Sequence, residues 1–178
     1  MTEDTSERDA GRATPEAVAE AFRAHDAFTV RDGRFRTETT VTEATATAAP
    51  TAGDRAGAFS VTVTVPTIGV AAADEVGPAV VDGWYETFEL RLADAFDVAR
   101  TSDFDPPSVE RGGGVVTATF EYRAWRASDG VADAKALVDY VEGTYVQGVV
   151  PGYDYDDPVA SLVEQAAERG GGNGPPPL

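Results

Sequence analysis

The sequence contains no cysteine and a single histidine, His25, and each shortage removes a class of chemistry. Without cysteine the chain forms no disulfide, thiolate nucleophile, iron–sulfur cluster or cysteine-ligated zinc. One imidazole is too few for a zinc site with two or more histidine ligands, and no G-x-S-x-G segment accompanies it. We expect His25 to end a helix, where a cation meets the negative end of the helix dipole. The sequence therefore predicts no catalytic residue and no metal site.

Long apolar runs and nucleotide-binding glycine motifs are also missing. No uninterrupted apolar run approaches the roughly 20 residues of a membrane span, and residues 1–10 are polar and acidic, unlike an export signal. The glycines at 112–114 have neither the phosphate-loop nor the dinucleotide-binding spacing, so they predict a turn. We therefore expect a cytoplasmic protein that binds neither a membrane nor a cofactor.

Basic residues are scarce, since 14 Lys and Arg stand against 31 Asp and Glu, a formal charge of −17 at pH 7. The one basic cluster, Arg31, Arg34 and Arg36, is diluted by neighbouring carboxylates, so we expect no nucleic-acid binding. The acidic residues are spread along the whole chain. Such a surface is typical of proteins adapted to concentrated salt, because the Debye length shrinks to roughly 3 Å at 1 M and surface carboxylates then repel little.

The periodicity of apolar residues predicts an α+β fold. Alternation over short segments predicts strands at 34–48, 58–65, 106–111 and 115–126. Repeats of about 3.6 residues predict helices at 15–25, 78–100, 128–145 and 157–168. Turn-forming residues join the strands in two pairs. We expect an antiparallel sheet of about four strands, built from two hairpins, with helices packed on one face.

The ends of the chain differ in composition from its middle. Residues 1–13 are polar and charged, and residues 170–178 are mostly glycine and proline, so neither end can build a core. We expect both ends to be disordered. The remaining segment, 14–169, has a length suited to one domain with a single core.

The two tryptophans differ in the side of their predicted element that they occupy: one lies on the apolar side and the other on the opposite side. Trp84 shares an apolar helical stripe with Phe88 and Leu92, which predicts a core position. Trp125 faces away from the apolar side of strand 115–126, so we expect it on the sheet face that the helices leave uncovered. The alternative is that a loop or the last helix covers it. An exposed tryptophan on an open sheet would serve as a contact for a partner protein or a second copy.

A second set of candidate residues is polar. Asp154 and Asp156 follow Tyr153 in the segment YDYDDP, and clustered carboxylates suit hard cations such as magnesium. The glycine and closing glutamate of an EF-hand are absent, so a loop with a helix cap is the first interpretation and a ligand site the second. Glu86 and Tyr145 are further polar groups that a small-molecule site would use.

Three segments carry a family resemblance: VPTIGV at 65–70, VVDGWYETFELRLADAFDV at 80–98, and VEGTYVQGVVPGYDY at 141–155. They resemble a small haloarchaeal family of unknown function, and the resemblance covers the chain from about residue 17 to 167. It implies a salt-adapted origin and a single domain, and it carries no activity, cofactor or catalytic residue. The order of helices and hairpins is also remotely similar to the bacterial secretion-chaperone-like fold, although a fold alone does not define function.

Two classes of function remain open. In the first, the protein is a non-enzymatic interaction module that binds a second copy of itself or another protein, with Trp125 as a contact. In the second, it binds or transforms a small molecule with carboxylates and tyrosines such as Glu86, Tyr145, Asp154 and Asp156. A deep, closed pocket lined by those groups would favour the second class, and an exposed apolar sheet face would favour the first.

The net charge of −17 predicts that KCl stabilises the fold. Raising KCl from roughly 0.1 to 2 M shortens the Debye length and removes the repulsion among surface carboxylates. We expect the denaturant midpoint, followed by tryptophan fluorescence, to rise steeply across this range. A midpoint that stays flat would contradict the salt-adaptation hypothesis.

Overall fold

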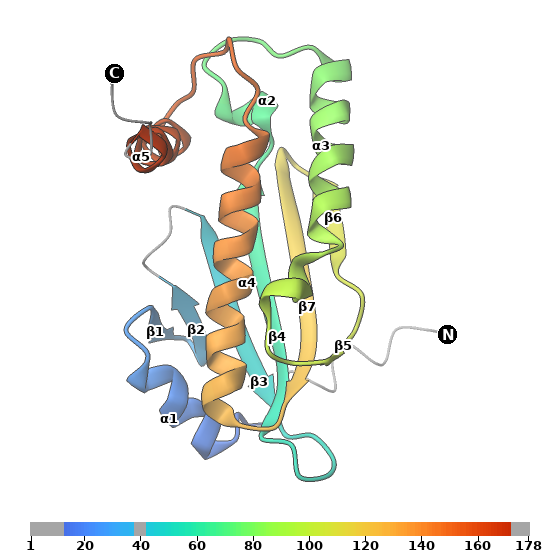
Figure 1. The fold of residues 1–178 in the computed structure, drawn as a ribbon, viewed down its shortest axis with the longest axis vertical. Coiled ribbons are helices and arrows are strands. Elements are labelled where there is room, and N and C mark those ends of the chain that lie inside the picture. Colours follow the sequence, from blue (N-terminus) through green and yellow to red (C-terminus); the bar gives the residue numbers. More distant parts are fainter. Residues whose placement is uncertain (1–12, 38–41, 172–178) are drawn as a thin grey trace, which may run out of the picture.

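A computed structural model describes residues 13–37 and 42–171, in which an antiparallel sheet of seven strands is covered by helices on one face (Figure 1). The strands are β1 (Phe28–Arg31), β2 (Arg34–Thr37), β3 (Glu43–Ala49), β4 (Gly57–Pro66), β5 (Asp103–Phe104), β6 (Ser108–Gly112) and β7 (Val115–Ala124). The helices are α1 (Glu16–Ala24), α2 (Ile68–Ala71), α3 (Pro78–Leu92), the 3-10 turn η1 (Ala95–Val98), α4 (Ala127–Gly148) and α5 (Val159–Gly171). The strand order is β1-β2-β3-β4-β7-β5, and β6 pairs with β7 beside β5.

The centre of the sheet is the pair β4 and β7, which run antiparallel from Gly57 opposite Ala124 to Pro66 opposite Val115. Burial alternates strictly along β4, with Phe59 and its apolar neighbours at every second position covered by the helices. The positions between them are half-exposed, and they hold Ala58, Ser60, Thr62, Thr64 and Pro66. This period of two is the one that predicted strand 58–65, because successive side chains of a strand point to opposite faces.

Helix α4 lies along the middle of the sheet, between α1 and α3 (Figure 1). Its buried stripe includes Val131, Ala134, Leu137, Val138 and Val141, as the 3.6-residue repeat predicted. Near its beginning, a Cβ atom at Gly130 would lie within 3 Å of three atoms of the Phe59 ring. The Tyr122 hydroxyl donates a 2.6 Å hydrogen bond to the Gly130 carbonyl. Glycine therefore sets how closely α4 approaches the sheet.

The prediction of about four strands was wrong at the edge formed by β1 and β2. The segment 34–48, expected to be one strand, contains two antiparallel strands in which Phe35 pairs with Ala46. Strand β1 was not predicted at all. It joins β2 through Asp32 and Gly33, whose φ angles are 53° and 72°. An Asp–Gly pair is typical of a two-residue hairpin turn, so the signal was present in the sequence.

The opposite edge also differs from the prediction. The strand expected at 106–111 runs from Ser108 to Gly112, and the short strand β5 precedes it on the same side of β7. Asp105 continues the β5 pairing, since its N–H donates to the Glu121 carbonyl at 2.9 Å. Pro106 and Pro107 then follow, and proline has no N–H to donate. The edge is therefore divided where two prolines stand together.

The helices agree with the prediction more closely. Those expected at 15–25, 128–145 and 157–168 are α1, α4 and α5, with shifts of up to three residues at their ends. The expected helix 78–100 was too long, because α3 ends at Leu92 and a 3-10 turn follows, while Ala95 and Phe96 still face the core and prolong the apolar pattern. Helix α2 was not predicted. The disorder expected at 1–13 and 170–178 lies almost entirely outside the described residues, and α5 reaches Gly171.

Alanine substitution at two glycines of α4 should change the stability of the fold in opposite directions. Gly130→Ala should lower the free energy of unfolding by about 2 kcal/mol, because the new methyl group meets the buried Phe59 ring. Gly143→Ala is the matched control, since nothing lies within 4 Å of a Cβ there, and it should stabilise the helix by roughly 0.5–1 kcal/mol. Urea denaturation of both variants at one KCl concentration measures the difference. Equal effects would show that α4 does not depend on close contact at Gly130.

Candidate functional site

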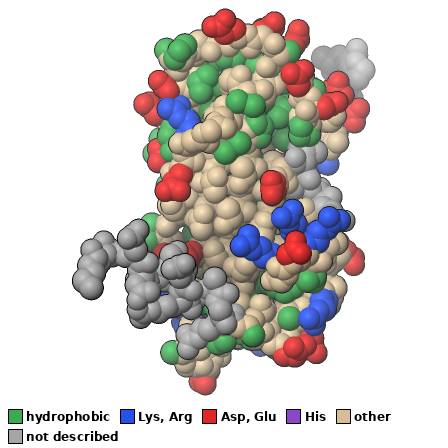
Figure 2. Space-filling model, turned by 180° about the vertical axis from the view of Figure 1, so that it is seen from behind, with side chains coloured by type: hydrophobic (Ala, Val, Ile, Leu, Met, Phe, Trp, Pro, Cys, Tyr) green, Lys and Arg blue, Asp and Glu red, His purple; other side chains and the backbone are tan. Residues whose placement is uncertain are grey.

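The sheet face opposite the helices has no helix packed against it in the described part of the chain; we call it the open face. Its centre carries small hydroxyl side chains, which occupy the positions between buried residues on the central strands: Thr45, Thr47, Ser60, Thr62, Thr64, Thr117 and Thr119. Strand register aligns them in rows, for example Thr45, Thr62, Thr119 and Ser108 across β3, β4, β7 and β6. Figure 2 shows this face as a mostly neutral centre with basic side chains gathered along one side.

A shallow hollow of about 360 Å³ lies on the open face. Arg34 and Glu43 line it together with five of the hydroxyl residues of β3 and β4. The hollow is polar and open to solvent. The open face is therefore hydroxyl-rich, and it is not the apolar surface that would have favoured an interaction module most directly.

Among the residues that the structure describes, the charges on the open face balance, although the whole chain carries −17. Register and ion pairs assign five arginines to this face and its corner: Arg31, Arg34, Arg36, Arg55 and Arg123. They assign five carboxylates to it as well: Glu43, Asp103, Asp105, Glu110 and Glu121. Three of the arginines lie on the β1–β2 edge, whereas four of the carboxylates lie on β5, β6, β7 and the segment after β5. Within the described residues, the charges of this face cancel and are polarised from edge to edge.

Trp125 lies at one corner of the open face, where β7 ends. Its side chain is 66% exposed, and the guanidinium carbon of Arg55 lies 4.1 Å from its ring centre. Arg55 is held in turn by Asp103 at 2.9 Å, and Asp103 also contacts Arg123 at 3.3 Å. A cation over an indole face is attracted by the ring's electrons. Arg55 thus covers one side of the Trp125 ring, and most of the side chain stays exposed, as expected for a residue on this face.

The acidic loop after α4 is structural in the described chain. The Asp154 carbonyl accepts a hydrogen bond from the Ala73 N–H at 2.8 Å, and the Asp156 N–H donates to the Ala71 carbonyl at 2.9 Å. Both carboxylates are exposed. Asp157 accepts hydrogen bonds from the backbone and hydroxyl of Ser161, so it caps the first turn of α5. Among the described residues, no group of three or more His, Asp or Glu side chains is placed to hold a metal ion.

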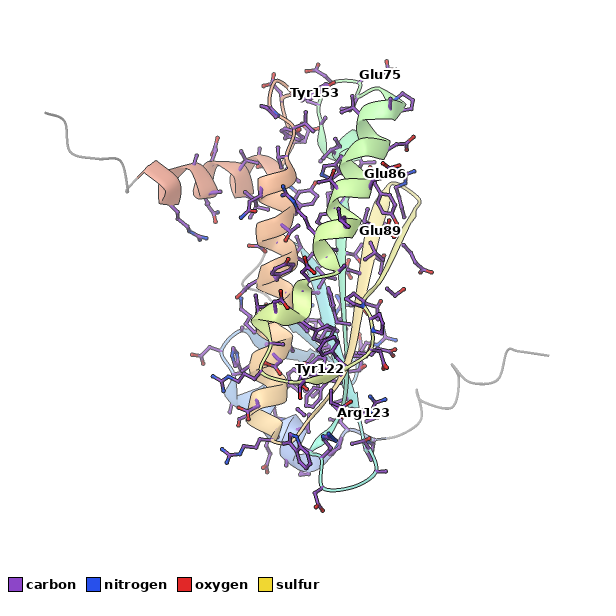
Figure 3. All side chains as sticks on the ribbon, turned by 45° about the vertical axis from the view of Figure 1, so that its right-hand side comes forward. Glu75, Glu86, Glu89, Tyr122, Arg123 and Tyr153 are labelled. Atoms are coloured by element: carbon purple, nitrogen blue, oxygen red, sulfur yellow. The ribbon has the colours of Figure 1, made fainter. Side chains whose placement is uncertain are left out.

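The other polar candidates do not converge. Tyr145 is 1% exposed, and burial raises the pKa of its hydroxyl well above the usual value, so the group stays protonated. Glu86 is exposed on α3, and Tyr153 lies half-buried in the loop at the far end of the molecule from Arg123 (Figure 3). Neither the hollow on the open face nor a second one between α3 and α4 contains Glu86, Tyr153, Asp154 or Asp156. Neither of these two hollows therefore brings the hypothesised small-molecule residues together.

The structure adds residues that the sequence interpretation passed over. Arg55 stands in the turn before β4, and nothing in its sequence neighbourhood indicates that it would cover Trp125. Arg34 and Arg36 did appear as a basic cluster, but their alternation with Phe35 would have placed them on the face away from the core. The same reasoning applied to Glu121 and Arg123 on β7 would have placed them on that face too.

Substituting the two tryptophans should separate a core residue from a surface residue. Trp84 is 5% exposed, so Trp84→Ala leaves a cavity and should lower the free energy of unfolding by about 3–5 kcal/mol. Trp125→Ala should lower it by less than about 1 kcal/mol and weaken self-association instead. Chemical denaturation and sedimentation velocity at high salt measure the two effects. A Trp125 variant that unfolds as easily as the Trp84 variant would remove Trp125 from any contact surface.

No helix in the described part of the chain combines the length and apolar character needed to cross a bilayer. Comparison with curated proteins and with solved structures finds no match for this sequence. A family of unknown function, DUF5813, matches residues 23–165. This match extends from the end of α1 to the middle of α5 and includes every strand. The chain therefore belongs to the DUF5813 family of unknown function.

Proposed function

We propose that the protein is a non-enzymatic interaction module that forms a homodimer through its open face. The observation that carries this proposal is the charge balance of that face on a chain of net charge −17. Two copies that approach through other surfaces bring excess carboxylates together, and like charges across an interface oppose association. The open face, where the described charges cancel, avoids this repulsion.

The distribution of charge along one register row supports pairing of the face with itself. Strand pairing places Arg31 opposite Arg34. Extending the β2–β3 register by one position beyond Phe35 and Ala46 brings Arg34 beside Thr47, and the row continues through Ser60 to Glu121. Asp105 ends the row, because its N–H bonds to the Glu121 carbonyl. The row thus has two arginines at one end, two carboxylates at the other and two hydroxyls between them.

Such a row is complementary to its own copy under one symmetry. A two-fold axis parallel to the strands, passing between β3 and β4, places the β1–β2 edge of one copy over the β5–β7 edge of the other. Arg34 then faces Glu121 of the second copy, and Arg31 faces Asp105, with each contact made twice. Closed two-fold dimers use the same patch on both subunits in this way.

The surroundings of this row are compatible with a wet, polar interface. The hydroxyl side chains on the open faces of the two copies would form hydrogen bonds with one another directly or through water. Interfaces of this kind are common. Trp125 supplies a large apolar group at the corner of the face, held there by Arg55. The salt-adapted, cytoplasmic setting predicted from composition would also favour association, because concentrated salt screens the remaining repulsion.

A charge-exchange experiment tests the dimer. Arg34→Glu and Glu121→Arg each place two pairs of like charges across the interface, and we expect each to weaken dimerisation about tenfold or more. The double variant, or an equimolar mixture of the two single variants, restores opposite charges and should recover the dimer. Glu89→Arg, an exposed position on α3, changes the net charge as Glu121→Arg does and serves as the control.

Sedimentation velocity at a KCl concentration that keeps the fold stable measures these affinities. A wild-type chain that remains monomeric up to ~100 µM, a concentration at which weak dimers with Kd near 10 µM are populated, would refute the proposal. A double variant that stays as weak as the single ones would refute the proposed orientation of the two copies.

A further inference from the structure

A second hollow lies on the helix side of the molecule, away from the open face. It has a volume of about 330 Å³ and runs between α3 and the end of α4, with Gly83, Trp84, Phe88 and Arg91 on one side and Gln147 and Gly148 on the other. We call it the α3–α4 groove. Its volume is at the small end of the range of sites that hold small molecules, roughly 300–1,000 Å³.

Two glycines help to keep the groove open: Gly83 inside α3 and Gly148 at the last position of α4. Nothing lies within 4 Å of a Cβ built on Gly83, so the space beside it is empty. A Cβ on Gly148 would lie 3.5 Å from Nε1 of Trp84, so this glycine leaves the edge of the indole uncovered by a side chain. Glycine inside a helix destabilises it relative to alanine. Helix stability alone would favour alanine at Gly83, which lies inside α3.

The floor of the groove is aromatic. The rings of Trp84 and Phe88 are stacked, with centres 5.2 Å apart and planes 10° apart. Tyr145 packs against both rings edge-on and supports them from below. The buried Nε1 of Trp84 has no hydrogen-bond acceptor among the described residues. A buried donor without an acceptor is unfavourable, so this wall of the groove keeps one polar group unsatisfied.

The charge of the groove is opposite to that of the chain. Arg91 is its only charged lining residue, and no carboxylate lines it although the chain carries 31. The Arg91 guanidinium forms no ion pair with the described residues. An aromatic floor binds an apolar body, and an unpaired guanidinium at the rim binds a carboxylate. We propose that the α3–α4 groove is a binding site for a small carboxylate with an apolar body.

Octanoate is a suitable probe, and octan-1-ol is its uncharged counterpart of equal chain length. In a Trp125→Phe background Trp84 is the only tryptophan, so its emission reports binding in the groove. We expect octanoate to change this emission and to bind about tenfold more tightly than octanol, because only the carboxylate pairs with Arg91. Failure of octanoate to bind at about 5 mM, which corresponds to a Kd weaker than any useful site, would overturn the proposal.

Two pairs of variants locate the site. Arg91→Gln should lower octanoate affinity about tenfold and leave octanol binding unchanged, whereas Arg126→Gln, at the other end of α4, should affect neither probe. Gly83→Leu fills the groove and should abolish binding of both probes, whereas Gly143→Leu introduces the same side chain away from it. Thermal unfolding of each variant establishes that it is folded. The assignment would be overturned if the two arginine variants, or the two glycine variants, lost equal affinity for octanoate. It would also be overturned if octanol bound as tightly as octanoate.

Discussion

The close contact of α4 with the sheet at Gly130 is the constraint on which the rest of the arrangement depends. Any side chain at this position would meet the Phe59 ring, and the Gly130 carbonyl accepts the hydroxyl of Tyr122, so glycine satisfies both the space and the hydrogen bond. One turn later, the buried Asp133 accepts hydrogen bonds from the N–H groups of Arg100 and Thr101. These contacts attach α4 to both central strands and to the segment that follows η1, and α1 and α3 pack on either side of it.

With all these helices on one face, the other face of the sheet must be stable in water. Threonine meets that need, because its branched side chain suits a strand and its hydroxyl stays hydrated. An apolar face of this size would promote aggregation, and a face as acidic as the rest of the chain would repel every acidic neighbour. The balanced rows of arginine, threonine and carboxylate avoid both outcomes. The proposed dimer uses this face, while the α3–α4 groove lies on the helix side, so the two proposals concern separate surfaces.

Some elements were predictable because their information is local. The alternation at 58–65 and the helical stripe around Leu137 specify both the element and its buried side. Trp84 and Trp125 were correctly separated into buried and exposed residues by the same periodicity. The hairpin at Asp32 and Gly33 was equally local and was missed, because the threonine-rich segment after it looked like one continuous strand. The prolines that divide the β5–β6 edge are local too, whereas the pairing of both short strands with β7 involves a segment further along the chain.

By itself, the sequence determined the α+β class, the strong acidity, the sides of the central strands and helices that face the core, and the exclusion of cysteine chemistry, because these follow from composition and period. Only the tertiary structure decided which polar groups meet. The polar groups hypothesised to form one site, Glu86, Tyr145 and Asp154, lie apart. By contrast, Arg34 and Glu121 lie in one row across the sheet although they are 87 positions apart in the chain. The physical reason is that local spacing decides which face of a strand a side chain occupies, but not which distant strand or helix packs beside it.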